Sequence, residues 1–302
     1  MKKVLVTGAL GFLGCHLIEK LKENYEVIAT DVPDAKVPDF LEPLMVENAD
    51  ITYKDSIDAV FEKHKNIDSV IHLAAYANPK GSEENPLFGA YINIQGALNV
   101  FESAMFSDVE RLVFMSSSAV YGIPKYDVIA EDHPRRPANM YGFSKLVSEQ
   151  VLSMCKDLDS VILRGANIYG PGQKNLLIPG LMEKIASNEI PYVNDAVRDY
   201  VHVDDISDAI LSALEYSGPE RIYNLGTGKG TKITEIWDII SDLFNERGFV
   251  VPEAKKGKLR AEEIRKITLS GDLAKKELGW IPKIDLKQGL TETVDHFIRE
   301  CD

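Results

Sequence analysis

A tyrosine and a lysine, Tyr141 and Lys145, lie four residues apart in a segment that has the pattern of a helix. Residues spaced i and i+4 share one face of a helix, so the two side chains would point to the same place. A lysine ammonium close to a phenol, together with the positive charge of a nearby nicotinamide, favours the phenolate and lowers the pKa of the tyrosine from about 10. A phenolate near neutral pH can accept a hydroxyl proton while hydride leaves the same carbon atom. The pair therefore suits a redox base, although the spacing alone is common in helices.

A glycine-rich segment runs from Thr7 to Gly14 and also contains Gly8 and Gly11. Glycines at this spacing let the chain turn tightly, approach a pyrophosphate and pack the following helix closely on a sheet. The N-terminus of that helix would then face the phosphates. Asp31 ends the second apolar run, 17 residues after Gly14. A carboxylate there accepts the hydroxyls of an adenosine ribose and repels the 2′-phosphate of NADP, so the pattern favours NAD.

Three serines, Ser116 to Ser118, begin where the fourth apolar run ends. Serine after a strand is ordinary turn chemistry. A serine at the carboxyl end of that strand would, however, point into the crevice that the other motifs face. It could place a hydrogen bond between a substrate oxygen and the tyrosine. The glycine loop, the acidic residue, the serine and the Tyr–Lys pair occur in the order that one site requires, and this joint occurrence is the main signal.

Short β-branched runs alternate with amphipathic segments through the first half of the chain. The runs cover residues 2–7, 25–30, 68–74, 111–116 and 160–165, and helices are expected near 12–23, 56–65, 84–106 and 140–156. Apolar runs of this length between helices indicate a parallel sheet that is covered on both faces. Right-handed crossovers then give a doubly wound, Rossmann-type α/β fold with its ligand crevice at the carboxyl ends of the strands.

The pattern changes after Gly170. Residues 170–198 carry three prolines around one short helix, residues 199–225 return to strand, helix and strand, and residues 227–302 are helix-rich and polar. We therefore predict a dinucleotide-binding domain of residues 1–169 plus 199–226. A smaller substrate domain would be assembled from residues 170–198 and 227–302.

The composition is that of an ordinary globular protein, with 45% hydrophobic and 27% charged residues. A formal net charge of -13 argues against a nucleic-acid partner, which needs clustered lysine and arginine. We find neither an apolar stretch of about 20 residues that could span a membrane nor the longer apolar segment of a signal peptide. The cysteines, Cys15, Cys155 and Cys301, form no metal-ligand pattern with histidine. We therefore expect no metal site. The small number of scattered cysteines also predicts a reducing, cytoplasmic location.

Taken together, the motifs resemble the extended short-chain dehydrogenase/reductases, and within them the NAD-dependent epimerase/dehydratase family. The resemblance covers nearly the whole chain and lies, in family order, in TGALGFLG (7–14), HLAA (72–75), NIQGALNV (93–100), SSSAVYG (116–122), YGFSK (141–145), RGANIYGPGQ (164–173), RDYVHVDDI (198–206) and YNLGTG (223–228). It implies a Rossmann domain with a C-terminal nucleotide-sugar domain, and NAD that stays bound through turnover. It also implies a homodimer through the helices expected at 84–106 and 140–156.

By this resemblance, Ser117, Tyr141 and Lys145 are the catalytic residues. The positions expected to contact NAD are Gly8, Gly11, Phe12, Leu13, Gly14, Asp31, Asp50, Ile51, Leu73, Ala74, Ala75, Asn93, Ser116, Tyr141 and Lys145. Asn93 also resembles the family asparagine that supports the active-site helix. The positions expected to bind the nucleotide sugar are Ser117, Ser118, Asn167, Arg198, Arg260 and Glu263. In the last group, Asn167, Arg198 and Arg260 would hold the diphosphate. Glu263 would bind the ribose of the nucleotide.

One departure from the family pattern narrows the chemistry. In the family's 4,6-dehydratases, Asp and Glu follow the catalytic serine or threonine, whereas this chain has Ser118 and Ala119. Neither residue can do that acid–base work, so the resemblance implies a nucleotide-sugar 4-epimerase that acts through a transient 4-keto sugar, with UDP-hexose as the expected substrate. The segment after GPGQ and the stretch before Arg198 are shorter than in typical 4-epimerases, which leaves the sugar open. A nucleotide-4-ketosugar reductase or dehydrogenase, a reductase of a substrate without a nucleotide, and a nucleotide-sensing scaffold protein also stay open.

Overall fold

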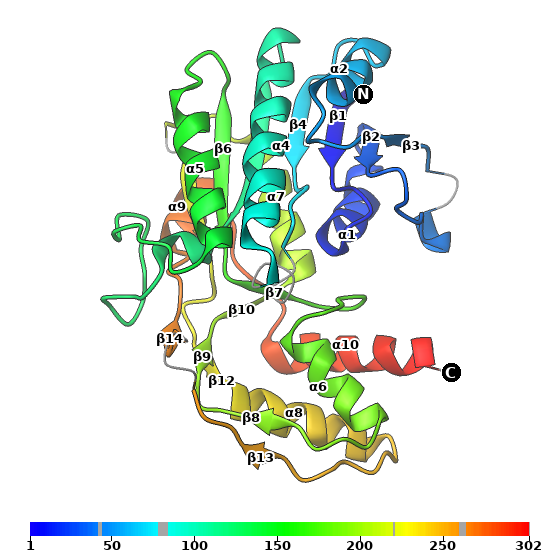
Figure 1. Ribbon diagram of the computed structural model, residues 1–302, viewed down its shortest axis with the longest axis vertical. Helices are drawn as coiled ribbons and strands as arrows, with labels where there is room; N and C mark the ends of the chain where they lie inside the picture. The colour runs from blue at the N-terminus through cyan, green and yellow to red at the C-terminus, as the bar shows by residue number, and fades with distance from the viewer. Residues whose placement is uncertain (42–43, 78–83, 220, 260–263, 302) are drawn as a thin grey trace.

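A parallel sheet forms the centre of the computed structural model, which describes residues 1–41, 44–77, 84–219, 221–259 and 264–301. Its seven strands lie in the order β11-β6-β5-β4-β1-β2-β3, and every neighbouring pair is parallel (Figure 1). The order reverses between β1 and β4, so the predicted doubly wound, Rossmann-type sheet is confirmed. The strands are β1 (Lys2–Thr7), β2 (Tyr25–Asp31), β3 (Val46–Asn48), β4 (Ser69–His72), β5 (Arg111–Ser117), β6 (Ser160–Gly165) and β11 (Ile222–Leu225).

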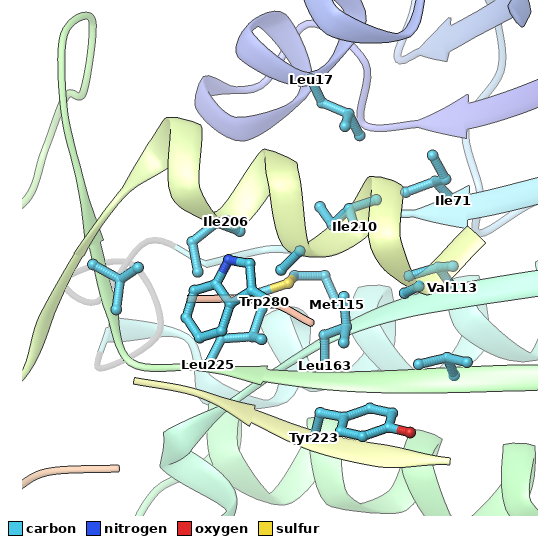
Figure 2. Packing of buried hydrophobic residues seen from close by; sticks show 14 of the residues in the cluster. Leu17, Ile71, Val113, Met115, Leu163, Ile206, Ile210, Tyr223, Leu225 and Trp280 are labelled. Atoms are coloured by element: carbon cyan, nitrogen blue, oxygen red, sulfur yellow. The ribbon is translucent and has the colours of Figure 1, made fainter. Parts of the chain in front are cut away.

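Helices cover both faces of this sheet, because its strands are apolar on both sides. Val4 and Val6 of β1 belong to one core cluster, and Leu5 between them belongs to another. The first cluster includes residues of α1 (Phe12–Leu21), α7 (Val203–Glu215) and α9 (Asp272–Leu278), and Figure 2 shows Leu17 and Ile210 in this layer. The second cluster includes residues of α2 (Lys54–Lys63), α4 (Pro86–Phe106) and α5 (Met140–Met154).

The helix ends follow local signals. Asn85 accepts a hydrogen bond from the amide of Phe88 and precedes Pro86, so α4 begins there rather than at residue 84. Asn139 accepts from the amide of Gly142 at 2.8 Å and so fixes the start of α5. A Cβ atom at Gly142 would overlap the carbonyl group of Ala119, which shows how closely α5 packs on the 3-10 turn η2 (Ser118–Tyr121). A second 3-10 turn, η1, spans Asp39–Leu41.

A second body with its own apolar core lies beyond the carboxyl ends of the strands, below the sheet in Figure 1. The paired strands β7 (Asn167–Tyr169) and β10 (Tyr200–His202) lie between the two bodies. The other elements of the second body are α6 (Leu177–Ala186), β8 (Tyr192–Val193), β9 (Val197–Arg198), β12 (Thr231–Lys232), α8 (Ile233–Glu246), β13 (Lys255–Lys256), β14 (Lys266–Ile267) and α10 (Leu286–Cys301). Among the helices in the described ranges, none has the length and apolarity required to cross a membrane.

Candidate active site

The glycine loop takes a shape that side chains would block. Gly8 has φ +71°, and a Cβ atom there would lie 2.7 Å from the amide nitrogen of Ala74. A Cβ atom at Gly14 would overlap the carbonyl oxygen of Gly8, so α1 packs directly on the loop. Gly11 is the N-cap of α1 and offers no side chain to its first-turn amides. Those amides are thus available to an anion, as the sequence predicted for a pyrophosphate.

Asp31 lies at the end of β2 beside this loop. Its Oδ2 atom accepts a hydrogen bond from the amide of Leu10 at 2.8 Å, and its Oδ1 atom accepts one from Val32 at 2.8 Å. The carboxylate faces a cavity of about 520 Å³. Of the residues predicted to contact NAD, this cavity is lined by Gly8, Gly11, Asp31, Asp50, Ile51, Leu73, Ala74 and Ala75. The loop and this cavity fit a dinucleotide, because the first-turn amides of α1 are open to a pyrophosphate and the carboxylate of Asp31 lies beside them for the adenosine ribose.

A second cavity, of about 430 Å³, holds the catalytic candidates. Phe12, Leu13, Ser116, Ser117, Tyr141, Lys145 and Asn167 line it together. Leu73 and Ala75, which follow β4, line both cavities, so the two cavities adjoin at the carboxyl ends of the strands. A ligand that extends along this edge of the sheet would contact the glycine loop at one end and the Tyr–Lys pair at the other.

Lys145 is held beneath the second cavity, 4% exposed. Its Nζ atom donates to the carbonyl oxygen of Met115 at 2.9 Å and lies 4.9 Å from the centroid of the Phe114 ring. Burial lowers the pKa of Lys145 to about 8, and the negative charge of Glu149 acts in the opposite direction. The lysine can therefore lose its charge within the range in which enzymes work.

Burial raises the pKa of Tyr141, and a hydrogen bond with Ser117 acts against this rise. Desolvation thus disfavours the phenolate in the protein by itself more than the surrounding groups favour it. The expected low pKa also included the positive charge of a nicotinamide, so it stays a prediction for the protein with its cofactor bound. A low pKa at Tyr141 requires further positive charge in the cavity.

The three serines have different surroundings, which the sequence could not distinguish. Ser117 lines the cavity, and its Oγ atom accepts from the amide of Ala119 at 3.2 Å. Ser116 also contributes to the lining of this cavity, but its hydroxyl donates to Glu149 at 2.5 Å, in the protein interior. Ser118 lies in η2 and lines neither cavity. Of the three hydroxyls, that of Ser117 is the one placed for chemistry beside Tyr141.

Asn93 on α4 connects the segment after β4 to α5. Its Oδ1 atom accepts from the amide of Tyr76 at 2.6 Å, and its Nδ2 atom donates to the hydroxyl of Ser144 at 3.0 Å. Ser144 lies next to Lys145 in the sequence. Asn93 therefore fixes α5 beside the strand ends through hydrogen bonds, while it lines neither cavity.

Only some of the residues predicted to bind the nucleotide sugar line the second cavity. Asn167 lines the second cavity, and its Nδ2 atom donates to the carbonyl oxygen of Asp199 at 3.0 Å. Arg198 lies on β9, donates to the carbonyl oxygen of Val197 at 3.0 Å and lines neither cavity. Arg260 and Glu263 lie outside the described residues. The sequence did not identify several further lining residues that the tertiary fold supplies, among them Asn139, Met140, Ile168, Gln173 and Leu176. Of these, Ile168 and Gln173 stand within the RGANIYGPGQ motif.

Comparison with known proteins agrees with this geometry. The sequence profile described as "NAD dependent epimerase/dehydratase family" matches residues 4–226. The chain belongs to this family. It is 37% identical to a putative UDP-glucose 4-epimerase of Methanocaldococcus jannaschii over 97% of each chain. Membership and the fit of the glycine loop identify NAD as the cofactor, which confirms the expectation from the sequence.

Solved structures of family members have the same fold. The UDP-glucose 4-epimerase of Thermotoga maritima, solved with UDP-glucose, is 30% identical, with a TM-score of 0.89 over 99% of this chain and 100% of that one. The UDP-glucose 4-epimerase of Thermus thermophilus, solved with NAD, is 31% identical, with a TM-score of 0.87 over 98% of this chain and 99% of that one. The similarity therefore extends over both bodies of the molecule.

Proposed function

We propose that this chain is an NAD-dependent nucleotide-sugar 4-epimerase and that its substrate is a UDP-hexose. The observation that carries the proposal is the single cavity shared by Ser117, Tyr141 and Lys145, directly beside the cavity at the glycine loop. The position after Ser117 holds Ser118, which lines neither cavity and cannot supply the carboxylate of a dehydratase. Relatives named UDP-glucose 4-epimerase across the whole chain support the same reaction.

In the proposed reaction, Tyr141 is the proton acceptor and donor. Its phenolate takes the proton of the sugar C4 hydroxyl, and the Ser117 hydroxyl donates a hydrogen bond to the same oxygen. NAD, when bound, would supply the hydride acceptor for C4 and the hydride donor for its return. Since burial raises the pKa of Tyr141, the charges of Lys145 and the oxidised cofactor must favour its phenolate. Tyr141 returns the proton once the 4-keto sugar presents its other face, and inversion at C4 results.

The nucleotide end of the substrate would be held between the two bodies. We assign its diphosphate to Asn167, which lines the second cavity, and to Arg198 on β9. The corresponding assignments of Arg260 and Glu263 rest on the resemblance alone. Fixing the diphosphate would keep the 4-keto sugar bound while the hexose turns. A domain of residues 1–169 plus 199–226 would then carry NAD, and residues 170–198 with 227–302 would enclose the sugar.

We also propose that the protein forms a homodimer and that it is located in the cytoplasm. Apolar side chains on α4 and α5 are exposed, with Phe106 at 80%, Phe143 at 47% and Met154 at 76%. A second copy of the two helices would cover them. Light scattering of the purified protein at micromolar concentration measures the mass directly, and a Phe143→Glu variant should shift it from dimer to monomer.

Proton NMR tests the reaction. The protein is incubated with UDP-glucose, UDP-galactose, and their N-acetyl and uronic acid forms, with catalytic NAD. The C4 epimer should accumulate without net reduction of NAD, and a Tyr141→Phe variant should lose about 10²- to 10⁴-fold in rate. Stoichiometric NADH formation or consumption would instead identify a dehydrogenase or a 4-keto reductase. No conversion of any of these sugars would contradict the UDP-hexose assignment.

A further inference from the structure

A buried ion pair lies directly behind the second cavity. Glu149 of α5 and Arg164 of β6 are each 1% exposed. The carboxylate accepts from Nη2 of Arg164 at 2.6 Å and from Nε at 2.9 Å. Removing two charges from water is costly unless their geometry is good and their remaining hydrogen bonds are satisfied. Neither residue belongs to the predicted catalytic or binding set, so the burial of this pair requires an explanation.

The ion pair continues into a chain of buried polar groups. Nη1 of Arg164 donates to the Tyr121 hydroxyl at 2.9 Å, and that hydroxyl donates to Oδ1 of Asn224 at 2.6 Å. On the opposite side, the Ser116 hydroxyl donates to Glu149 at 2.5 Å. The carboxylate thus accepts hydrogen bonds from both β5 and β6. Such a network holds the strand ends in one arrangement, because each partner left alone would be a buried, unsatisfied group.

Glu149 and Lys145 lie one turn apart on the same face of α5. They bind consecutive residues of β5: Nζ of Lys145 donates to the carbonyl oxygen of Met115, and Glu149 accepts from the Ser116 hydroxyl. The next residue of the strand is Ser117, which lines the cavity. The helix therefore fixes the strand end at two points immediately before the serine that is to meet the substrate.

We propose that Glu149 is a positioning residue of the active site: it fixes the end of β5 through Ser116, and it places a carboxylate one helical turn from the Lys145 ammonium. This inference rests on the proposed 4-epimerase function. Arg164 serves as the counter-ion that makes the buried carboxylate tolerable, so the Lys145–Glu149–Arg164 set acts as one unit. A purely structural ion pair would stabilise the fold without affecting how Lys145 titrates.

The direct test measures the protonation of Lys145. Protein labelled with ¹³C at the lysine ε-carbons is titrated by NMR, and the Lys145 signal is identified by its loss in Lys145→Met. In Glu149→Gln the pKa of Lys145 should fall by one unit or more, about a tenfold loss of proton affinity. This readout needs no substrate, so it remains valid if the epimerase assignment fails.

Two further variants keep the test decisive. Glu149→Gln leaves Arg164 buried without a counter-ion and could unfold, whereas the double variant Glu149→Gln/Arg164→Met removes both charges. Ser116→Ala keeps the ion pair and the charge near Lys145 but removes the link to β5. It should therefore leave the Lys145 titration unchanged and lower kcat about tenfold through misplacement of Ser117, with KM little changed.

The epimerase pH profile supplies the second readout. If Lys145 must be charged, the alkaline loss of kcat should move to lower pH in Glu149→Gln and in the double variant, but not in Ser116→Ala. A folded Glu149 variant with the wild-type Lys145 titration and only a lower Tm would overturn the electrostatic part of the inference. Wild-type kcat in Ser116→Ala would overturn the positioning part. Absence of epimerisation in the wild type would count against the proposed function and leave the NMR result standing.

Discussion

The ring of His16 connects α1 to the main chain of Pro171, since Nε2 of His16 lies 2.9 Å from the Pro171 carbonyl oxygen. Nδ1 of the same ring lies 3.0 Å from Oδ1 of Asp204. Both partners are acceptors, so the ring must donate from both nitrogens, which only the imidazolium can do. Burial opposes this charge, but the hydrogen bonds to Asp204 and Pro171 outweigh it and raise the pKa of His16. A charged histidine therefore joins the helix of the glycine loop to the segment between the two bodies.

Replacing His16 should destabilise the protein in a pH-dependent way. Because its pKa is raised on folding, its contribution is fully present below the unfolded value of 6.5 and is lost as the pH rises through the folded pKa. We expect His16→Ala to lower the free energy of unfolding by about 1 kcal/mol in acid, since the ring is partly exposed. Urea unfolding of both proteins should give a smaller difference at about pH 9 than at about pH 6. If the variant and the wild type differed by the same free energy of unfolding at the two pH values, the His16 ring would act by packing alone.

His72 should have the opposite pH dependence. Burial, and then the charge of Lys145, lower the pKa of His72 to about 3, and its ring stacks on Phe114. Between pH 6.5 and about pH 3 the unfolded chain therefore binds more protons than the folded protein does. The free energy of unfolding falls as the pH falls through that range. The decrease in the free energy of unfolding approaches about 1.4 kcal/mol per pH unit. His72→Phe should flatten this acid limb in unfolding experiments, at some cost near neutrality because the hydrogen bond to Thr7 is lost. An unchanged acid limb would contradict the assignment.

Gly8→Ala should weaken NAD binding, because the new Cβ atom would lie 2.7 Å from the Ala74 amide nitrogen and φ is +71°. We expect a loss of about 1–3 kcal/mol in stability from the backbone strain and at least about tenfold in NAD affinity. Gly180→Ala in α6 is the matched control, because its Cβ atom would meet nothing within 4 Å. The free energy of unfolding of this control should rise by about 0.5–1 kcal/mol, because alanine is more favourable than glycine inside a helix. Calorimetry measures both quantities, and equal NAD affinity in the two variants would reject the role of the loop.

Asp31→Asn should reduce the preference for NAD over NADP. The amide retains an oxygen for the Leu10 amide but removes the charge that repels a 2′-phosphate. We expect the ratio of the two dissociation constants to shift toward NADP by about tenfold. Fluorescence titration with NADH and NADPH measures this ratio. If both affinities fell equally, Asp31 would be acting on the loop conformation rather than on cofactor choice.

The sequence by itself determined the features that depend on local spacing. The alternation of apolar runs and helices predicted the strands of the sheet except β3, a three-residue edge strand that no apolar run marks. The glycine interval predicted the loop around Gly8 and Gly14, and the i, i+4 interval placed Tyr141 and Lys145 on one helix. These patterns are readable because helix and strand periods are properties of the backbone itself. The start of α5 after Asn139 agrees with the expected residue 140, whereas α4 starts at Pro86 rather than at the expected residue 84, because the side chain of Asn85 caps it.

Only the tertiary structure decided which serine hydroxyl is left for the cavity, since that of Ser116 is bound to Glu149, and which charged groups are buried together. The contact between Glu149 and Arg164 joins residues 15 apart, and that between His16 and Pro171 joins residues 155 apart, with no periodic pattern to mark either. The raised pKa of Tyr141 in the protein by itself also comes from the tertiary structure, because desolvation depends on everything that surrounds the phenol. Burial and long-range pairing are properties of the assembled core, and the free energy of a charge depends on them more than on its neighbours in sequence.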